Sequence, residues 1–461
     1  MPLLSELAGM VEEVRPVRPR STSSHPNARF PEPPNTHLGL HSPRLTPSAP
    51  PDARQPTVVI KVGTSSLLRQ EAGTLHLSQI CALCETVARL HKQGVRVVLV
   101  SSGAVGAGMF RMGLSEKPKE VAKKQALAAV GQVHLMRYYE DIFNTIGIKC
   151  AQVLLTLENL SNRKQYVRAR GTFGALFEMG VVPVVNENDT VAVEELKFGD
   201  NDTLSAQVAA LVDARWLFLL TDVDGLYTAN PHTDPSATRI ESVENINELD
   251  VDLGGAGSSV GTGGMITKLT AARIACAAGC KTIVCLSANL ERDVEAAVIE
   301  GKSVGTAFLP AKKAAKGKKK WILAVPVRGE IAVDDAGEKA VLRGLPLLLT
   351  HVVGVSGEDF RVQECVTVRD AEGNELARGL CNYPATTLRD SVASRGDPAE
   401  AIEREQGWED DLDGPPECVH ANNMCVTHVE TLSRSFTFSD FQGAGYDSGA
   451  RDSSDEEREA A

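Results

Sequence analysis

The segment from Val181 to Gln207 constrains this chain most. It begins with a β-branched run, Val181 to Val185, interrupted by one proline, which is typical of a buried parallel strand. Two groups of side-chain amides and carboxylates follow the run: Asn186, Glu187, Asn188 and Asp189, then Asp200, Asn201 and Asp202. Because ligands of open α/β sheets bind beyond the carboxyl ends of the strands, these groups predict a binding crevice. A mixture of amides and carboxylates suits a ligand that carries an ammonium group beside a carboxylate, as an amino acid does.

A simpler interpretation of the same segment stays open. Asn and Asp favour turns and helix N-caps, so Asp202 or Thr203 would cap a helix that starts at Leu204. Two polar groups on either side of a single loop favour the binding crevice over this alternative.

Strands and helices alternate along the chain from Thr57 to Phe308, which predicts an α/β domain built on a parallel sheet. We expect strands from Thr57, at Val95 to Val100, Cys150 to Leu155, Val181 to Val185, Arg215 to Leu220 and Thr282 to Val284. We expect helices at Leu77 to Gln93, closed by Gly94, at Val121 to Thr145, Asn162 to Met179, Leu204 to Val212 and Leu290 to Ile299, and one that contains Lys268.

The pattern changes after a lysine-rich stretch, Lys312 to Lys320. From Trp321 the sequence predicts short strands without long helices, including WILAVPV, KAVLR and a continuation through ATTLRDSV, and hence a small β barrel or sandwich. The predicted organisation is a disordered N-terminal extension (1–55), an α/β domain (56–310), a basic linker (311–320), a β-rich domain (321–428) and a disordered acidic tail (429–461).

Composition excludes some classes of protein. A net charge of -12 argues against a general nucleic-acid binder, and no apolar run reaches the length of a membrane span. The ten cysteines lack metal-ligand spacing and predict buried, reduced thiols in a reducing compartment. We therefore expect a cytoplasmic protein. The Arg-, Ser- and Pro-rich N-terminus keeps an organellar location open as the alternative.

Three glycine-rich turns could hold phosphates: Gly63, residues 101–108 and residues 254–264. Lys61 and Lys268 each lie beside one of them, and bound phosphate would give both ammonium groups a partner; two ordinary surface lysines are the alternative. No activated Ser or Cys and no histidine belongs to these motifs. A carboxylate substrate would need none, because it is already ionised at neutral pH.

Six motifs resemble those of the glutamate 5-kinases, a branch of the amino acid kinase superfamily. They are VVIKVGTSSL (58–67), VVLVSSGAVGAG (97–108), VPVVNENDTVA (182–192), FGDNDTLSA (198–206), LLTDVDGLYT (219–228) and GTGGMITKL (261–269). The resemblance implies a parallel-sheet sandwich of the amino acid kinase type, followed by a PUA-like barrel. It also implies phosphorylation of the side-chain carboxylate of L-glutamate by ATP, with Mg²⁺, as the first step of proline synthesis.

The resemblance also implies roles for individual residues. The catalytic residues would be Lys61, Lys268 and Asp202; those that bind glutamate would be Ser102, Asp189, Asn201, Asn186 and Asp200. The ATP site would comprise Lys61, Thr221, Asp222, Thr262, Gly263, Gly264, Met265, Ile266, Thr267 and Lys268. No residue is assigned to a metal.

The family further implies inhibition by proline, a homo-oligomer and hand-off of the labile acyl phosphate to a glutamate-5-semialdehyde dehydrogenase. RNA binding is not expected, because residues 347–357 (LLLTHVVGVSG) lack the positive groups that RNA would need. Two alternatives stay open. One is a related kinase of acetylglutamate, aspartate or carbamate, although an N-acetyl substrate would leave Asp189 and Asp200 without an ammonium partner. The other is a PUA-type RNA-binding protein with a kinase-like scaffold.

Overall fold

The computed structural model describes residues 55–69, 72–192, 201–229, 234, 236–244, 246, 249, 264–312, 314–393 and 416–428. Its α-helices are α1 Thr64–Leu67, α2 Leu77–Lys92, α3 Ala104–Arg111, α4 Val121–Thr145, α5 Leu157–Ser161, α6 Arg163–Glu178, α8 Asn201–Leu211, α9 Met265–Ala277, α10 Leu290–Val298, α11 Lys318–Ile322, α12 Asp335–Leu342 and α13 Ala385–Ala393. Its strands before residue 310 are β1 Thr57–Val62, β2 Leu68–Arg69, β3 Thr74–Leu75, β4 Arg96–Ser101, β5 Lys149–Leu155, β6 Val181–Glu187, β7 Trp216–Thr221, β8 Leu226–Tyr227, β9 Arg239–Ile240, β10 Ser242–Val243, β11 Lys281–Leu286 and β12 Thr306–Phe308.

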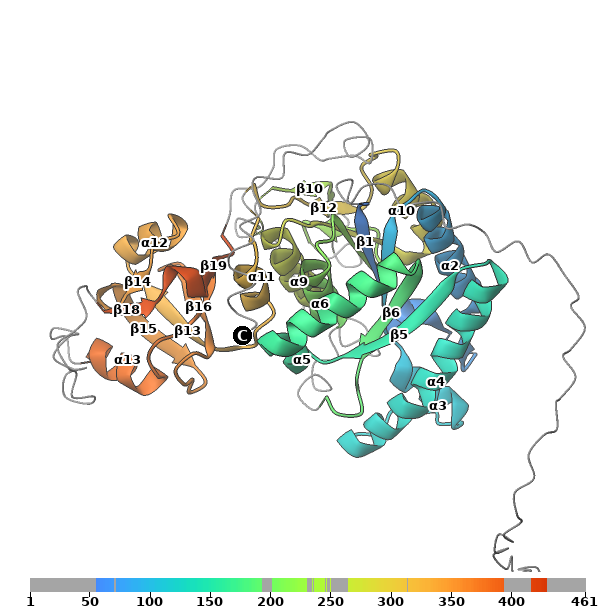
Figure 1. Cartoon of the computed structure of the whole chain (residues 1–461), viewed down its shortest axis with the longest axis horizontal. Coiled ribbons are helices and arrows are strands. Elements are labelled where there is room, and N and C mark those ends of the chain that lie inside the picture. The colour runs from blue at the N-terminus through green and yellow to red at the C-terminus, as the bar shows by residue number, and fades with distance from the viewer. Residues whose placement is uncertain are drawn as a thin grey trace, which may run out of the picture. The chain divides into compact units, whose positions relative to one another are not determined.

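An eight-stranded sheet forms the centre of the first domain (Figure 1). Its strand order is β10-β12-β11-β7-β1-β4-β6-β5, and neighbouring strands run parallel except β11 and β12. The strands in the middle of the sheet are apolar in sequence because helices cover both faces. Parallel strands place their carboxyl ends at one edge, and this edge carries the polar residues that follow each strand.

The two faces of the sheet pack against different helices. Side chains such as Val58 and Ile60 point to the face covered by α2, α4 and α10, whereas the intervening Val59 points to the face covered by α6, α8 and α9. Helix α8 is buried along nearly its whole length, which explains why its sequence, NDTLSAQVAAL, lacks a charged outer face.

The structure confirms several predicted elements. Helix α4 has the predicted bounds, and α2 ends one residue before the predicted end. Gly94, two residues after α2, has φ +81° and provides the left-handed residue that closes such a helix.

Two predictions about the first domain are wrong. Most of the glycine-rich stretch 101–108 is not a loop: Gly103 turns the chain at φ +93°, and α3 then starts at Ala104. The small residues of this stretch serve helix packing as well as chain turning. In addition, the helix expected from Leu204 starts at Asn201, so Asp202 lies in its first turn and does not precede it.

Helices α3 and α4 touch through their backbones. A Cβ atom on Gly131 of α4 would lie 1.8 Å from the carbonyl oxygen of Ala104 in α3, and one on Gly108 would lie 1.9 Å from that of Leu127. Neither position has room for a side chain. These two glycines therefore fix the position of α3, and with it that of the turn between β4 and α3.

The second domain contains a five-stranded sheet in the order β15-β13-β16-β17-β19 and a separate β14–β18 pair. These strands are β13 Val327–Val333, β14 Leu347–Leu348, β15 Val352–Gly357, β16 Cys365–Arg369, β17 Glu375–Leu380, β18 Glu417–Val419 and β19 Met424–Val426. Apolar side chains of these strands and of α12 and α13 form its core. A small β-rich domain was predicted from the sequence.

Two strand predictions in this part, WILAVPV and KAVLR, are wrong, and ATTLRDSV, which was expected to continue an all-β domain, is helical as well. KAVLR belongs largely to α12, where the Asp334 side chain accepts a hydrogen bond of 2.8 Å from the backbone N–H of Gly337 and caps the helix. ATTLRDSV forms most of α13, which follows Pro384 directly. Trp321 and Ile322 of WILAVPV end α11, and β13 starts only at Val327.

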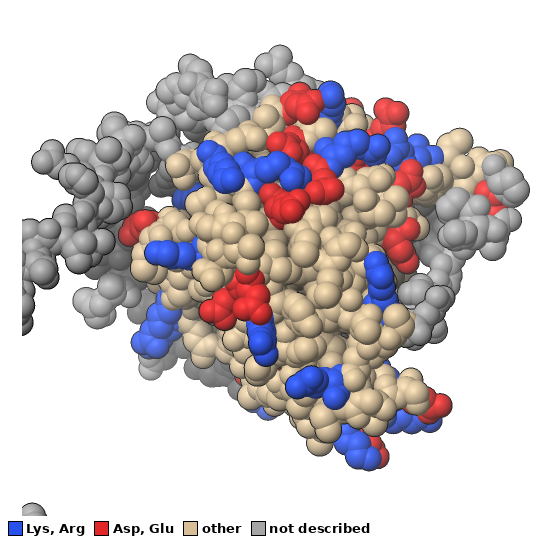
Figure 2. All heavy atoms as spheres, turned by 90° about the vertical axis from the view of Figure 1, so that its right-hand side faces the viewer, with Lys and Arg blue, Asp and Glu red and all other residues tan. Residues whose placement is uncertain are grey.

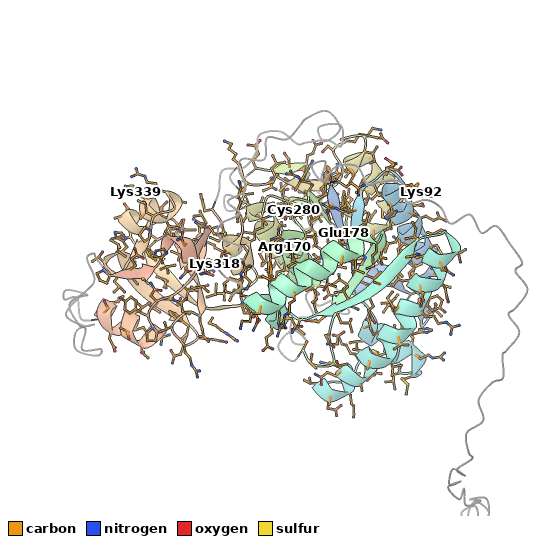
Figure 3. All side chains as sticks on the ribbon, viewed as in Figure 1. Lys92, Arg170, Glu178, Cys280, Lys318 and Lys339 are labelled. Atoms are coloured by element: carbon orange, nitrogen blue, oxygen red, sulfur yellow. The ribbon has the colours of Figure 1, made fainter. Side chains whose placement is uncertain are left out.

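The ten cysteines are free thiols, eight of them buried and two half-buried, as predicted. Burial raises the pKa of Cys276 to about 12 and raises that of Cys280, which lies between α9 and β11 (Figure 3), well above its ordinary value. Such thiols are unreactive at neutral pH. The predicted bounds of the domains stay predictions, and the expected disordered ends lie outside the described residues, apart from residue 55.

On the face shown in Figure 2, acidic and basic side chains are interspersed around a broad uncharged area. Among the described helices, none combines the length and the apolar character that spanning a membrane would require.

We expect Gly131→Ala to destabilise the protein by about 2 kcal/mol, because the added methyl group would force α3 and α4 apart. Gly171→Ala in α6 is the matched control, since a Cβ atom there would have no atom within 4 Å; it should be neutral or stabilising, as alanine favours helices. Chemical denaturation of both variants measures the difference. Equal stability of the two variants would contradict the close contact.

Candidate active site

Strands β1, β4, β6 and β7 bring the predicted polar residues together at the carboxyl edge of the sheet. Lys61 is the second-last residue of β1, Ser102 follows β4, Asn186 lies near the end of β6 and Thr221 ends β7. Helices α8 and α9 add Asn201, Asp202 and Lys268 from their N-terminal ends. The order of the strands in the sheet, which differs from their order in the sequence, makes these residues neighbours.

Asp202 binds both predicted lysines. Its Oδ1 atom lies 2.5 Å from Lys61 Nζ, and its Oδ2 atom lies 3.3 Å from Lys268 Nζ. Asp202 is 0% exposed, Lys61 is 6% exposed and Lys268 is 5% exposed. The interpretation of these lysines as ordinary surface residues is therefore wrong. Three buried charges sum to +1, which suits a site for anions.

The carboxylate of Asp202 stays ionised in spite of its burial. Burial alone would raise its pKa, but the positive charges of Lys61 and Lys268 outweigh that effect and lower the pKa from 3.8 to about 2. The Thr267 hydroxyl lies 2.9 Å from Asp202 Oδ2 and can donate to it. The N-terminus of α8 further favours a negative charge at this position.

Asn201, the residue before Asp202, connects the other strand ends. Its Nδ2 group donates to the Ser101 carbonyl oxygen (2.8 Å), to Ser102 Oγ (3.0 Å) and to Asn186 Oδ1 (3.0 Å). Its Oδ1 atom is buried and has no hydrogen-bond partner among the described residues. A buried acceptor of this kind favours a ligand with an N–H donor, such as an ammonium group.

Gln132 of α4 is a site residue that the sequence analysis missed. Its Oε1 atom accepts a hydrogen bond of 2.6 Å from Asn186 Nδ2, while Asn186 Oδ1 also accepts from the backbone N–H of Glu187 (2.9 Å). These two bonds fix the orientation of the Asn186 amide. The signal in the sequence that could have indicated Gln132 is its polar side chain next to the helix positions Ala128, Gly131 and Leu135, which are buried in α4.

Asp189 lies half-buried in the turn after β6. Its charge acts on Lys117, whose pKa is lowered mainly by burial and is raised in part by Asp189. Asp200, the remaining predicted substrate-binding residue, lies outside the described residues.

The described residues of the predicted ATP site lie at the ends of β1 and β7 and at the start of α9. The buried Thr221 donates a hydrogen bond of 3.0 Å to the exposed Asp222. Gly264 caps α9, and Met265, Ile266, Thr267 and Lys268 form its first turn, where free backbone N–H groups favour an anion. Thr262 and Gly263 lie outside the described residues.

Gly63 belongs to the part of the site that can hold phosphate groups. A Cβ atom there would lie 3.8 Å from Lys61 Nζ, so the glycine leaves the approach to this ammonium group open. Two ammonium groups, a helix N-terminus and a glycine turn together can hold and neutralise phosphate groups.

The chain is similar to known proteins over both of its domains. Residues 56–287 match the amino acid kinase family, and residues 329–404 match the PUA domain. The glutamate 5-kinase of Synechococcus elongatus is 46% identical over 374 residues, covering 80% of this chain and 99% of that protein. The glutamate 5-kinase of a Nostoc species is 51% identical over 339 residues, covering 72% and 89%. The solved UMP kinase of Ureaplasma parvum shares 14% identity with a TM-score of 0.38, covering 55% of this chain and 99% of that chain, a likeness too low to support an inference.

We expect Asp202→Asn to destabilise the protein by about 3 kcal/mol, because it removes the buried carboxylate whose charge compensates the ammonium groups of Lys61 and Lys268. The lowered pKa of Asp202 means that its carboxylate stabilises the fold fully above the ordinary value of 3.8 and loses this effect only as the pH falls towards about 2. Urea denaturation should therefore show the same difference between wild type and variant from pH 8 to pH 5. A difference that shrinks within this range would contradict the assignment.

Proposed function

Because this chain belongs to the glutamate 5-kinases, within the amino acid kinase family, we propose that it transfers the terminal phosphoryl group of ATP to the side-chain carboxylate of L-glutamate. The product is L-glutamyl 5-phosphate, and the reaction is the first step of proline biosynthesis. The observation that carries the proposal is the buried Asp202, which holds Lys61 and Lys268 at one point at the carboxyl edge of the sheet.

The reaction needs charge compensation and no proton abstraction. The glutamate side chain has a solution pKa of about 4.3, so the attacking carboxylate is ionised at neutral pH. Its approach to the terminal phosphate of ATP brings anions together. Lys61 and Lys268 supply positive charge to the transferring phosphoryl group, and Asp202 keeps both ammonium groups in place before the substrates bind.

The substrate amino acid is bound on the Asn201 side of the site. The free acceptor Asn201 Oδ1 and the carboxylate of Asp189 suit the ammonium group, and the Ser102 hydroxyl suits the α-carboxylate. Asn186, held by Gln132, positions the Asn201 amide. Asp200 belongs to the same proposal through the family motif alone.

ATP is bound by Thr221, Asp222 and the N-terminal turn of α9, together with Thr262 and Gly263. The family implies Mg²⁺, and among the described residues no three His, Cys, Asp or Glu side chains converge as ligands. Both oxygens of Asp202 already face lysines, so an ion held through the phosphates of ATP and water fits this site better than one held by protein carboxylates. When bound, Mg²⁺ would neutralise charge on the phosphates.

We further propose proline as a feedback inhibitor, because a small amino acid fits the same Asn-rich region. Glutamate affinity that stays constant as proline is added would contradict this.

We also propose that the chain forms a homo-oligomer, which sedimentation tests. We propose that the labile product is handed to a glutamate-5-semialdehyde dehydrogenase; a coupled assay with and without contact between the two enzymes tests this. The free thiols support the cytoplasm, with an organelle as the alternative.

Hydroxamate formation tests the proposed reaction. Purified protein with ATP and Mg²⁺ should convert glutamate into a product that hydroxylamine traps, because an acyl phosphate reacts with this nucleophile. N-acetylglutamate should give less than one hundredth of that rate, since it cannot pair with Asn201 Oδ1 and Asp189 through an ammonium group. Comparable rates with both substrates would assign the chain to a different acid kinase.

We expect Lys268→Ala to lower kcat by about 100-fold or more, because one charged group is lost from the transition state. Lys281→Ala is the matched control: this lysine is also buried, but it starts β11 at the opposite edge of the sheet. Its variant should keep kcat within about threefold. Steady-state kinetics measures kcat for both variants, after circular dichroism has shown that each variant is folded like wild type. Near-normal kcat for Lys268→Ala would contradict its catalytic role.

A further inference from the structure

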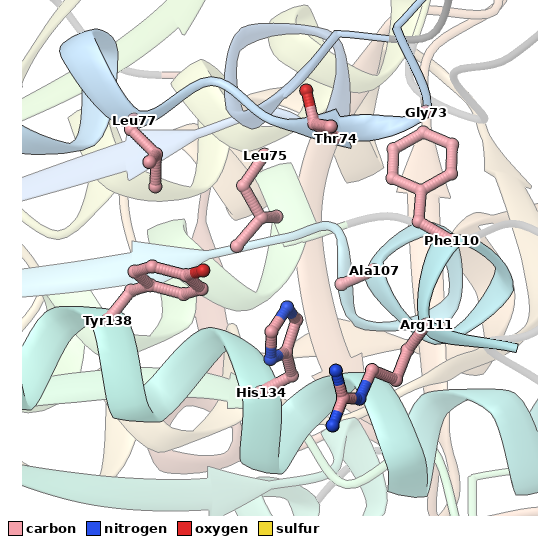
Figure 4. A pocket seen from close by; sticks show the side chains of 9 residues that line it. All are labelled: Gly73, Thr74, Leu75, Leu77, Ala107, Phe110, Arg111, His134 and Tyr138. Carbon is pink, nitrogen blue, oxygen red and sulfur yellow. The ribbon is translucent and has the colours of Figure 1, made fainter.

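A groove of about 290 Å³ lies between β3, the start of α2, α3 and α4 (Figure 4). Thr74, Leu75, Phe110, Arg111, His134 and Tyr138 line it. None of these residues takes part in the proposed kinase site. We propose that the groove binds a compact aromatic carboxylate and that this ligand modulates the kinase site.

The charge of the groove favours an anion. Among the residues that the structure describes, its lining contains Arg111 and His134 but no Asp or Glu. Arg111 is exposed in the last turn of α3 and makes no hydrogen bond or ion pair that the structure records with a described residue. Figure 4 shows the guanidinium of Arg111 and the ring of His134 close together on the same side of the groove. A carboxylate between them would receive charge-assisted hydrogen bonds.

The pKa of His134 is consistent with a site for an anion. Its pKa is lowered by burial first, and then by the positive charges of Arg111 and Arg137. A bound anion would oppose both charges and raise this pKa again.

The remaining walls suit an aromatic body. Phe110 and Tyr138 come from different helices, and Leu75 adds an aliphatic side chain. The rings of His134 and Tyr138 meet edge to face, with centroids 5.1 Å apart. The small volume restricts the ligand to a single ring with a short acidic arm. Because the described lining residues offer no carboxylate that could pair with an ammonium group, a keto acid fits better than the corresponding amino acid.

The groove is connected to both halves of the kinase site. On one side, α3 starts two residues after Ser102, and its backbone contacts Gly131 of α4, next to Gln132. On the other side, the His76 N–H, directly after β3, donates a hydrogen bond of 2.7 Å to the Leu67 carbonyl oxygen at the end of α1. Helix α1 follows Gly63. A ligand in the groove would therefore fix the substrate side of the site relative to its phosphate side.

Isothermal titration calorimetry of the full chain with phenylpyruvate tests the site, and this binding measurement does not depend on the proposed activity. We expect saturable binding of one ligand per chain, weakened at least 10-fold by Arg111→Gln and by replacement of the ligand with phenylalanine or inorganic phosphate. Arg137→Gln is the control, because Arg137 is 79% exposed, pairs with Asp141 and acts on His134 without lining the groove; its variant should bind as wild type does.

Three outcomes would overturn the proposal: no binding at millimolar phenylpyruvate, equal affinity in the Arg111→Gln variant, or displacement of the ligand by glutamate or ATP at saturation. The modulation is measured as a change in the KM for glutamate when phenylpyruvate is present. We expect at least a twofold change in wild type and none in Arg111→Gln, whose KM without ligand should equal that of wild type. An unchanged wild-type KM would overturn the modulatory part of the proposal.

Discussion

The ion pairs of Asp202 with Lys61 and Lys268 impose the strictest constraint on this fold. A carboxylate with no exposed surface is costly to bury unless its charge is compensated. Compensation here requires a strand end, β1, and two helix N-termini, those of α8 and α9, to meet at one point. Any displacement of one of these elements would separate a buried charge from a partner of opposite charge. The same arrangement creates a buried excess of positive charge, which is what a site for repelling anions needs.

Helix α8 shows how stability and function share one element. Its second half fills the space between the sheet and the neighbouring helices with small and aliphatic side chains. Its first turn presents Asn201 to the strand ends β4 and β6 and Asp202 to the lysines. The substrate side of the site therefore contains Asn201, and the phosphate side contains the next residue, Asp202. Because both residues belong to one buried helix, the backbone fixes the distance between the two sides.

Contact between the backbones of α3 and α4 also explains how Ser102 and Gln132 are held in the site. Glycines at 108 and 131 let α3 and α4 approach until main-chain atoms touch. Such a contact leaves little freedom for one helix to slide over the other. Gln132 lies within this rigid pair of helices and Ser102 lies two residues before α3, so the contact between the helices fixes the position of both residues near the Asn186 amide.

The sequence by itself determined the α/β domain, most of its helix and strand positions, and the residue types of the site. Local patterns carry this information: β-branched runs predict strands, and polar residues directly after a strand lie at the edge where ligands bind. The sequence did not determine that residues 104–111 form a helix, since glycines read as a loop can equally serve close packing. Nor did it indicate α12 and α13, whose short amphipathic segments fit strands as well as helices.

Only the tertiary structure decided which residues meet. Lys61 and Lys268 are far apart in the chain, and they converge on Asp202 because the sheet order places β7 and β1 side by side under α8 and α9. Gln132 could not be assigned from its neighbours in the sequence, because its role depends on a hydrogen bond to a strand 54 positions away. Contacts of this kind arise from packing between elements, and a local pattern contains no information about the partner.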